Sequence, residues 1–115
     1  MWLLFIACTA ATSSPPEVPS RLVAIGDLHG DPVAALRAMK LAGLVDEKGS
    51  WTGGKSWLVQ TGDVTDRGPD SRGVLALLRR LQTEAQNQGG RVIPLLGNHE
   101  VMNVQGDWRY VSPED

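Results

Sequence analysis

The chain has 115 residues, of which 42% are hydrophobic and 21% are charged, and its formal net charge is −2. This composition supports one small packed domain and argues against a wholly disordered chain. Because there is no surplus of positive charge, the chain lacks the electrostatic footprint of a nucleic-acid-binding protein. Its single cysteine excludes an intrachain disulfide and a thiolate zinc cluster, so any metal ion must be held by His, Asp, Glu or Asn side chains.

Residues 1–20 differ in composition from the rest of the chain. Residues 1–11 are apolar and uncharged, and residues 12–20 form a Ser/Pro-rich linker. This order is typical of a secretory signal, and residues 5–8 resemble a bacterial lipidation motif ending at Cys8. The apolar stretch is too short to span a bilayer, and no Lys or Arg precedes it. Two interpretations stay open: export as a periplasmic, secreted or lipid-anchored protein, or an N-terminal extension on a cytoplasmic one.

The first strand and helix are predicted directly after this segment. Residues 21–25 form a short apolar run closed by Gly26, which predicts a buried strand. Asp31 followed by Pro32 predicts a helix start, because Asp is a favoured N-cap and Pro is favoured at the first helical position. Gly43 ends this helix. Its apolar face is formed by residues at helical spacing: Val33, Leu36 and Met39.

Residues 46–56 are polar and Gly-rich, which predicts a loop or a hairpin tip. Within them, residues 49–56 match the phosphate-binding string G-x-x-x-x-G-K-[ST]. That motif requires a strand before it and a helix after it, so that the helix N-terminus meets the phosphate. Here a predicted helix comes first, and the apolar residues 57–61 follow as a second strand. The hairpin tip is therefore the better interpretation.

A long helix and a third strand complete the pattern. Asp70 is the predicted N-cap, and the glycines at 89–90 end the helix. Its apolar residues recur at helical spacing: Val74, Leu77, Leu78, Leu81 and Ala85. Residues 91–96 predict a third strand, although Pro94 cannot donate to a sheet ladder. A short helix is predicted after Asn98.

This alternation of strands and helices predicts an α/β fold with parallel strands joined by crossover helices. The loops that follow the three strands are then brought to one edge of the sheet, where open α/β folds bind their ligands. The three loops are residues 26–30 (GDLHG), 62–68 (GDVTDRG) and 97–100 (GNHE). Each begins with a glycine, which suits a sharp turn.

These loops contain potential metal ligands. Asp27 and His29, two apart on an extended loop, can point the same way and bind one cation. Asp63 can bridge this cation and a second one, to which Asn98 offers a carbonyl oxygen. Taken singly, such residues are usually turn formers, solvated histidines or surface ion pairs. Three loops at one edge that include both histidines of the chain instead favour a site for Mn, Fe, Zn or a similar divalent ion.

The three loop motifs resemble the signature segments of the phosphoprotein phosphatases, within the calcineurin-like metallophosphoesterases. The ending Asp66-Arg67-Gly68 is more specific than the Gly-Asp pair of the wider superfamily. Further segments are similar to the Shewanella-like protein phosphatases, a subgroup of that family. They are WTGG (51–54), LVQTGD (58–63), LLGNHEVMN (95–103) and GDWRYV (106–111). The resemblance extends from about residue 22 to about residue 111.

The resemblance implies a centre of two divalent metal ions. Asp27 and His29 match the ligands of the first ion, Asp63 matches the bridging carboxylate, and Asn98 matches a ligand of the second. It also implies that residues 21–115 are the N-terminal part of a β-sandwich flanked by helices. The family takes two further histidines and another arginine from later loops, so the chain is expected to be a fragment with an incomplete site and little activity of its own.

The resemblance further implies roles in phosphoester hydrolysis. Arg67, together with Asn98, matches the residues that bind the substrate phosphate. His99 matches the proposed proton donor to the leaving group, and Asp66 matches the carboxylate that orients it. The implied reaction is direct attack by a hydroxide that bridges the two metals, without a phosphoenzyme.

Three functions stay open at this point. The first is hydrolysis of phosphomonoesters, with phosphoserine, phosphothreonine or phosphotyrosine proteins as the implied substrates. The second is a diadenosine-tetraphosphatase-like or other small-molecule phosphatase, since such relatives share the same loops. The third is a non-catalytic module that binds metal or phosphate. The expected partner is a phosphorylated protein or a small phosphoester, with no nucleic acid and no transmembrane span, and the sequence leaves the oligomeric state open.

Overall fold

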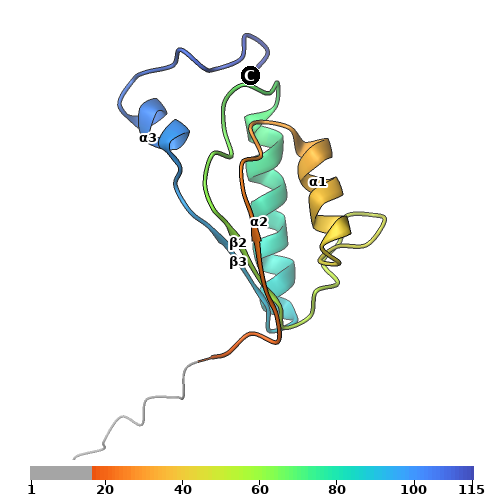
Figure 1. Ribbon diagram of the computed structural model, residues 1–115. Helices are drawn as coiled ribbons and strands as arrows, with labels where there is room; N and C mark the ends of the chain where they lie inside the picture. Colours follow the sequence, from red (N-terminus) through yellow and green to blue (C-terminus); the bar gives the residue numbers. More distant parts are fainter. Residues whose placement is uncertain (1–16) are drawn as a thin grey trace, which may run out of the picture.

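The computed structural model describes residues 17–115, so the predicted signal segment and Cys8 lie outside the described residues. The described chain forms a three-stranded sheet with its two longer helices packed on one face (Figure 1). No helix in this part of the chain is long and apolar enough to cross a membrane. The elements in chain order are β1 (Leu22–Ile25), α1 (Pro32–Leu41), β2 (Trp57–Gln60), α2 (Ser71–Asn87), β3 (Arg91–Pro94) and α3 (Asn98–Val104).

The sheet has the order β1-β2-β3 and is parallel throughout, which confirms the predicted α/β fold. Leu58 of β2 pairs with Val23 of β1 and Val92 of β3, and all three face the helices. Each strand is shorter than predicted: β1 begins one residue later, β2 ends one residue earlier and β3 ends two residues earlier. Pro94 is the last residue of the edge strand β3, where its missing N–H interrupts no ladder.

Both helices begin at the predicted N-caps. The Asp31 carboxylate accepts a hydrogen bond from the Ala34 N–H at 2.9 Å, and Pro32 occupies the first helical position. The Asp70 carboxylate accepts one from the Gly73 N–H at 2.7 Å. These bonds satisfy backbone donors that have no partner within the helix.

The apolar face predicted for α1 was partly wrong. Met39 and Ala35 are buried and lie one turn apart on the stripe facing the core, whereas Val33 is 69% exposed. Leu36 is only partly buried. The helix is short and mostly alanine on its inner side, so the position of the larger aliphatic residues does not identify its buried stripe. For α2 the predicted face was correct, with Leu77 only partly buried.

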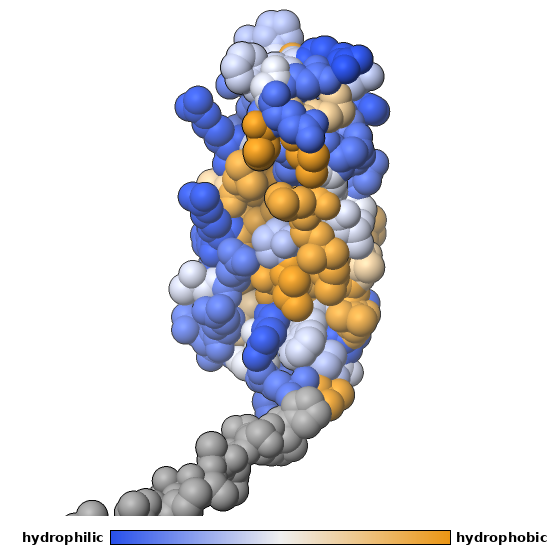
Figure 2. Space-filling model, turned by 90° about the vertical axis from the view of Figure 1, so that its left-hand side faces the viewer, coloured by the Kyte–Doolittle hydropathy of each residue, from blue (hydrophilic) through white to orange (hydrophobic). Residues whose placement is uncertain are grey.

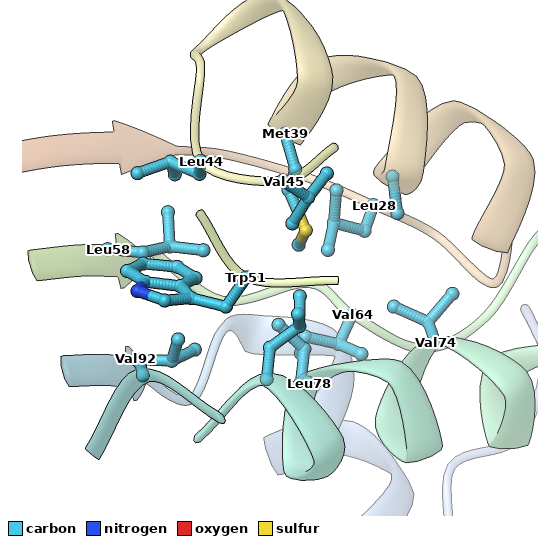
Figure 3. Packing of buried hydrophobic residues seen from close by; sticks show 13 residues of the cluster. Leu28, Met39, Leu44, Val45, Trp51, Leu58, Val64, Val74, Leu78 and Val92 are labelled. Carbon is cyan, nitrogen blue, oxygen red and sulfur yellow. The ribbon is translucent and has the colours of Figure 1, made fainter. Parts of the chain in front are cut away.

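Residues 46–56 are anchored to the core by Trp51, which is 2% exposed (Figure 3). The Trp51 N–H donates to the Glu84 carboxylate on α2 at 2.7 Å, and its indole N–H donates to the Gly54 carbonyl at 3.1 Å. The segment that matches a phosphate-binding string lies before β2, at the end of the strand opposite the three loops. A strand follows it, as predicted, so it has no helix N-terminus to offer a phosphate.

The sheet face opposite α1 and α2 is apolar and uncovered in the described chain. Figure 2 shows apolar side chains gathered over this face. Leu22 on β1 is 62% exposed, and Leu95, which follows β3, is 48% exposed. The prediction that residues 21–25 form a fully buried strand is therefore wrong for the described residues: one face of β1 packs on the helices and the other does not. The second sheet implied by the family resemblance is not formed by residues 17–115.

We expect Glu84→Gln to destabilise the fold in a pH-dependent way. The hydrogen bond from the Trp51 N–H holds the pKa of Glu84 below its ordinary value of 4.5, although burial opposes the shift. A lowered folded-state pKa contributes stability above the unfolded-state value, and this contribution is lost as the pH falls through the folded-state pKa. Glu84→Gln should therefore lower the free energy of unfolding by about 1 kcal/mol at neutral pH, and the difference should vanish in acid.

The free energy of unfolding is measured by urea unfolding of the chain, followed by tryptophan fluorescence. The measurement is repeated from neutral pH down to a pH below the folded-state pKa of Glu84. Glu47→Gln is the matched control, because Glu47 is 95% exposed and its ion pair with Lys40 should contribute little. A difference between Glu84→Gln and the unsubstituted chain that stays constant down to acid pH would contradict the assignment.

Candidate active site

The three predicted loops meet at the carboxyl edge of the sheet. Two N–H groups of the first loop, from Leu28 and His29, donate to the Asp63 carbonyl in the second loop at 2.9 and 3.0 Å. The Gly30 N–H donates to the Val64 carbonyl at 2.8 Å. In Figure 1, α3 and the C-terminal residues lie at the same end of the sheet as these loops. The fold therefore brings the three loops together at one edge of the sheet, as the strand order predicted.

The loops are held in conformations that L-residues rarely adopt. Four non-glycine residues in the described part of the chain have positive φ, and all four are predicted site residues: His29, Asp63, Asp66 and Arg67. The loops also approach too closely to admit side chains at glycines such as Gly62 and Gly68. A Cβ on Gly62 would lie 2.4 Å from the Gly97 nitrogen, and one on Gly68 would lie 2.1 Å from the His29 oxygen. Such strain persists only where surrounding contacts hold the backbone in place.

Glu100, on the first turn of α3, supplies much of that restraint. One carboxylate oxygen accepts from the Val64 N–H, the Thr65 N–H and the Thr65 hydroxyl at 2.8, 2.9 and 3.0 Å. The other accepts from the Asp63 N–H and the Gly97 N–H at 2.9 and 2.7 Å. Burial alone would raise the pKa of Glu100, but the N–H donors of Thr65, Gly97 and Asp63 outweigh it and lower the pKa. The carboxylate joins the second loop to the third.

Gln60, the last residue of β2, likewise joins the first loop to the second by hydrogen bonds. Its side chain is fully buried. Its amide donates to the Gly62 carbonyl at 2.6 Å and to the Gly26 carbonyl at 3.4 Å, and it accepts from the Gly62 N–H at 3.1 Å. Sequence reasoning missed the roles of Gln60 and Glu100. A polar residue at the buried end of an apolar strand was the available signal for the first, and a glutamate at the third position of a helix for the second.

On one side of the site lie the residues predicted to bind the first metal ion. The His29 Nδ1 donates to the Thr65 carbonyl at 3.1 Å, which leaves Nε2 free to bind a cation. That Nε2 lies 3.6 Å from the carboxylate of Asp27, whose side chain is 67% exposed. Asp63 accepts the His99 N–H on one carboxylate oxygen at 3.0 Å. Asn98 is exposed at the start of α3, next to His99.

The other side of the site contains a buried histidine–carboxylate pair. The His99 Nδ1 donates to Asp66 at 2.9 Å, and the two side chains are only 3% and 1% exposed. The His99 Nε2 lies 3.4 Å from the Arg67 guanidinium, which itself is exposed. The structure thus brings Asp66, Arg67 and His99 together, as predicted.

One geometric observation differs from the predicted ligand set. Among the His, Cys, Asp and Glu side chains of the described residues, His29, Asp63 and His99 have ligand atoms within 4.8 Å of one another, so this group includes His99 and not Asp27. The Nδ1 of His99 is already bonded to Asp66, and its Nε2 faces the positive charge of Arg67. Because that charge opposes a cation at the same nitrogen, His99 is a weaker candidate ligand than His29 and Asp63.

Tyr110 is a further residue at this site that sequence reasoning did not identify. Its ring lies 5.2 Å from the His99 ring and 5.7 Å from the Arg67 guanidinium carbon, measured to the Tyr110 centroid. The Tyr110 carbonyl accepts the Arg67 N–H at 2.8 Å. The C-terminal residues therefore fold back against the loop that carries Arg67.

Comparison with known proteins identifies the class to which this fold and site belong. Residues 20–114 match the calcineurin-like phosphoesterase family, and the chain belongs to that family. The predicted resemblance to the Shewanella-like protein phosphatases is also confirmed. The Shewanella-like protein phosphatase 2 of Arabidopsis thaliana is 51% identical over 96 residues, which cover 84% of this chain and 25% of that protein. The Shewanella-like protein phosphatase 1 of Plasmodium berghei (strain Anka) is 39% identical over 95 residues, covering 83% and 26%.

The fold is similar to a solved relative as well. The crystal structure of the cold-active protein-tyrosine phosphatase of a psychrophilic Shewanella species matches with a TM-score of 0.77 and 36% identity, over 84% of this chain and 31% of that one. These three relatives are named as phosphatases. The chain spans about a quarter to a third of their length.

We expect Glu100→Gln to loosen the second loop. The substitution replaces one of the two acceptor oxygens by an amide that faces N–H donors, so at least two of the five hydrogen bonds are lost. The free energy of unfolding should fall by about 2 kcal/mol, and amide hydrogen exchange at residues 63–65 should accelerate. Mass-spectrometric hydrogen exchange on the chain measures this, with the exposed Glu47→Gln as control. Unchanged protection at residues 63–65 would show that Glu100 does not hold the loop.

Proposed function

We propose that this chain supplies the first three loops of a metal-dependent phosphomonoester hydrolase acting on phosphorylated proteins. The observation that carries the proposal is the meeting, at one sheet edge, of a carboxylate–imidazole cluster with a buried Asp66–His99 pair and an exposed arginine. In this proposal the remaining groups of the site come from outside these 115 residues. The protein phosphatase names of the relatives support a phosphoprotein substrate.

The residues present fit a divalent metal centre. His29 and Asp63 offer an imidazole nitrogen and a carboxylate oxygen in the cluster, and Asp27 lies beside His29. The donor set of imidazole, carboxylate and amide oxygen suits Mn, Fe or Zn. We assign Asp27 and His29 to one ion, Asp63 to both and Asn98 to the other. Two such ions, when bound, supply an activated water nucleophile and neutralise charge on the phosphoryl oxygens.

The residues on the other side of the cluster suit the phosphate and the leaving group. The Arg67 guanidinium is exposed and can present its planar fork to two phosphate oxygens. We assign the exposed Asn98 amide to the same phosphate. His99 can deliver a proton from Nε2, because Asp66 holds its Nδ1–H and stabilises the charged ring. Arg67 and His99 are neighbours at 3.4 Å, so a phosphate bound by one has its leaving group within reach of the other.

The proposal is tested with the chain inside a complete domain. Residues 20–114 replace the matching segment of the Arabidopsis phosphatase, and the chimera is assayed with manganese on a phosphopeptide. We expect hydrolysis, and we expect Asp63→Asn to reduce its rate about 100-fold or more and to lower the bound metal content. Asparagine keeps one oxygen for the His99 N–H, so the loop should stay folded.

Glu47→Gln is the control for loss of a carboxylate, because Glu47 is 95% exposed and pairs with Lys40 on α1. It should keep both metal content and rate. Equal rates for Asp63→Asn and the unsubstituted chimera would overturn the enzyme proposal. A chimera that binds metal but hydrolyses neither phosphopeptides nor dinucleoside polyphosphates would favour a non-catalytic module, and one that prefers dinucleoside polyphosphates would favour a small-molecule phosphatase.

A second prediction concerns phosphate binding by Arg67. Arg67→Lys keeps the charge but loses the planar fork, so inhibition of the chimera by inorganic phosphate should weaken about 10-fold. Arg79→Lys, on the exposed face of α2, serves as the control and should leave inhibition unchanged. Equal inhibition constants for Arg67→Lys and the unsubstituted chimera would remove Arg67 from the phosphate site.

A further inference from the structure

Asn103, on the last turn of α3, connects the buried pair to the rest of the site. Its amide nitrogen donates to the Asp66 carboxylate at 2.8 Å and to the Thr65 hydroxyl oxygen at 3.2 Å. It lies four residues after His99, so the two side chains project from the same face of the helix. Both side chains reach Asp66, one at each carboxylate oxygen.

The surroundings determine which end of the Asn103 amide faces Asp66. An ionised carboxylate only accepts hydrogen bonds. The Thr65 hydroxyl gives its hydrogen to Glu100 at 3.0 Å, so its oxygen is left to accept as well. Both partners therefore require the NH₂ group of Asn103, while its carbonyl oxygen is buried without a hydrogen-bond partner among residues 17–115. The side-chain contacts of Asn103 in this part of the chain are therefore made by its NH₂ group.

Asp66 has little freedom once these bonds are made. One oxygen accepts from Asn103 and the other from the His99 Nδ1, and the Asp66 N–H donates to the Ser71 hydroxyl at 3.2 Å. The side chain is 1% exposed, so water has little access to replace a lost donor. Without the Asn103 amide, one carboxylate oxygen is left unpaired, and the carboxylate can rotate away from His99 to satisfy it.

We propose that Asn103 is a positioning residue that acts through Asp66 on His99. It locks the carboxylate so that Asp66 accepts the Nδ1–H of His99 and Nε2 is aimed at the leaving group. In the neutral ring this contact selects the Nδ1–H tautomer, and in the charged ring Nε2 carries the proton that is delivered. The expected effect of Asn103 on the rate of hydrolysis rests on the proposed phosphatase function. The expected effect of Asn103 on the tautomer of His99 does not.

The kinetic test compares leaving groups in the chimera described above. Asn103→Leu keeps the approximate size of the side chain but removes both donors. For phenyl phosphate, whose leaving group needs a proton, kcat should fall about 10- to 100-fold with little change in KM. For p-nitrophenyl phosphate, which leaves readily as an anion, the loss should be no more than about 3-fold. A purely structural role would reduce both rates alike.

Two further variants make the result specific. His99→Asn should show the same dependence on the leaving group, and adding Asn103→Leu to it should cause little further loss, since both act on one proton transfer. Asn103→Val also removes both donors and adds no charge beside Asp66, so it serves as the second variant if Asn103→Leu folds poorly. Gln105→Leu, at the exposed end of α3, is the control for an added apolar side chain.

A spectroscopic test uses this chain alone. When the His99 ring is neutral, its nitrogen-15 chemical shifts should show Nδ1 protonated and Nε2 bare in the unsubstituted chain, and a mixture of tautomers in Asn103→Leu or Asn103→Val. An unchanged tautomer in both variants, or equal losses on the two aryl phosphates, overturns the inference. A chimera without activity on either substrate overturns the proposed function instead, and the His99 shifts then still decide for or against Asn103.

Discussion

The carboxylate of Glu100 is the contact on which the rest of the site depends. It accepts five hydrogen bonds from two loops that are about 35 residues apart in sequence. Asp63, whose carboxylate belongs to the cluster with His29 and His99, has its backbone held by one of these bonds. Because Glu100 stands directly after Asn98 and His99, the same turn of helix that carries two functional side chains also fixes the loop opposite them.

The hydrogen bonds to Glu100 help to explain why strained backbone conformations persist at this site. Positive φ at His29, Asp63, Asp66 and Arg67 costs free energy at each position. The residues with positive φ lie where two loops pass close together. At these contacts the glycines have no room for a Cβ atom. The close approach lets N–H groups of one loop reach carbonyls of the next, and those bonds offset the strain. The direction of the functional side chains is therefore set by the backbones of neighbouring loops rather than by their own rotamers.

Sequence patterns predicted the parallel sheet, both N-caps and the meeting of the three loops, because these features follow from local chemistry and strand order. Asp31 and Asp70 cap their helices whatever surrounds them. The parts that could not be predicted depend on contacts between distant segments. Glu100 and Asn103 are ordinary helix residues until the loop after β2 is placed beside them, and Val33 was assigned to the core because spacing alone does not say which stripe of a short helix faces the sheet.

The predicted site residues fall into a buried inner half and an exposed outer half. Asp66 and His99 are buried and have hydrogen-bond partners within the chain, so their geometry is complete before any ligand arrives. Asp27, with its side chain 67% exposed, lies beside Nε2 of His29, whose side chain is 19% exposed. A carboxylate oxygen beside a bare imidazole nitrogen suits a cation held between them. The inner half is thus organised by this chain, and the outer half is the part whose order should depend on metal and on groups supplied from elsewhere.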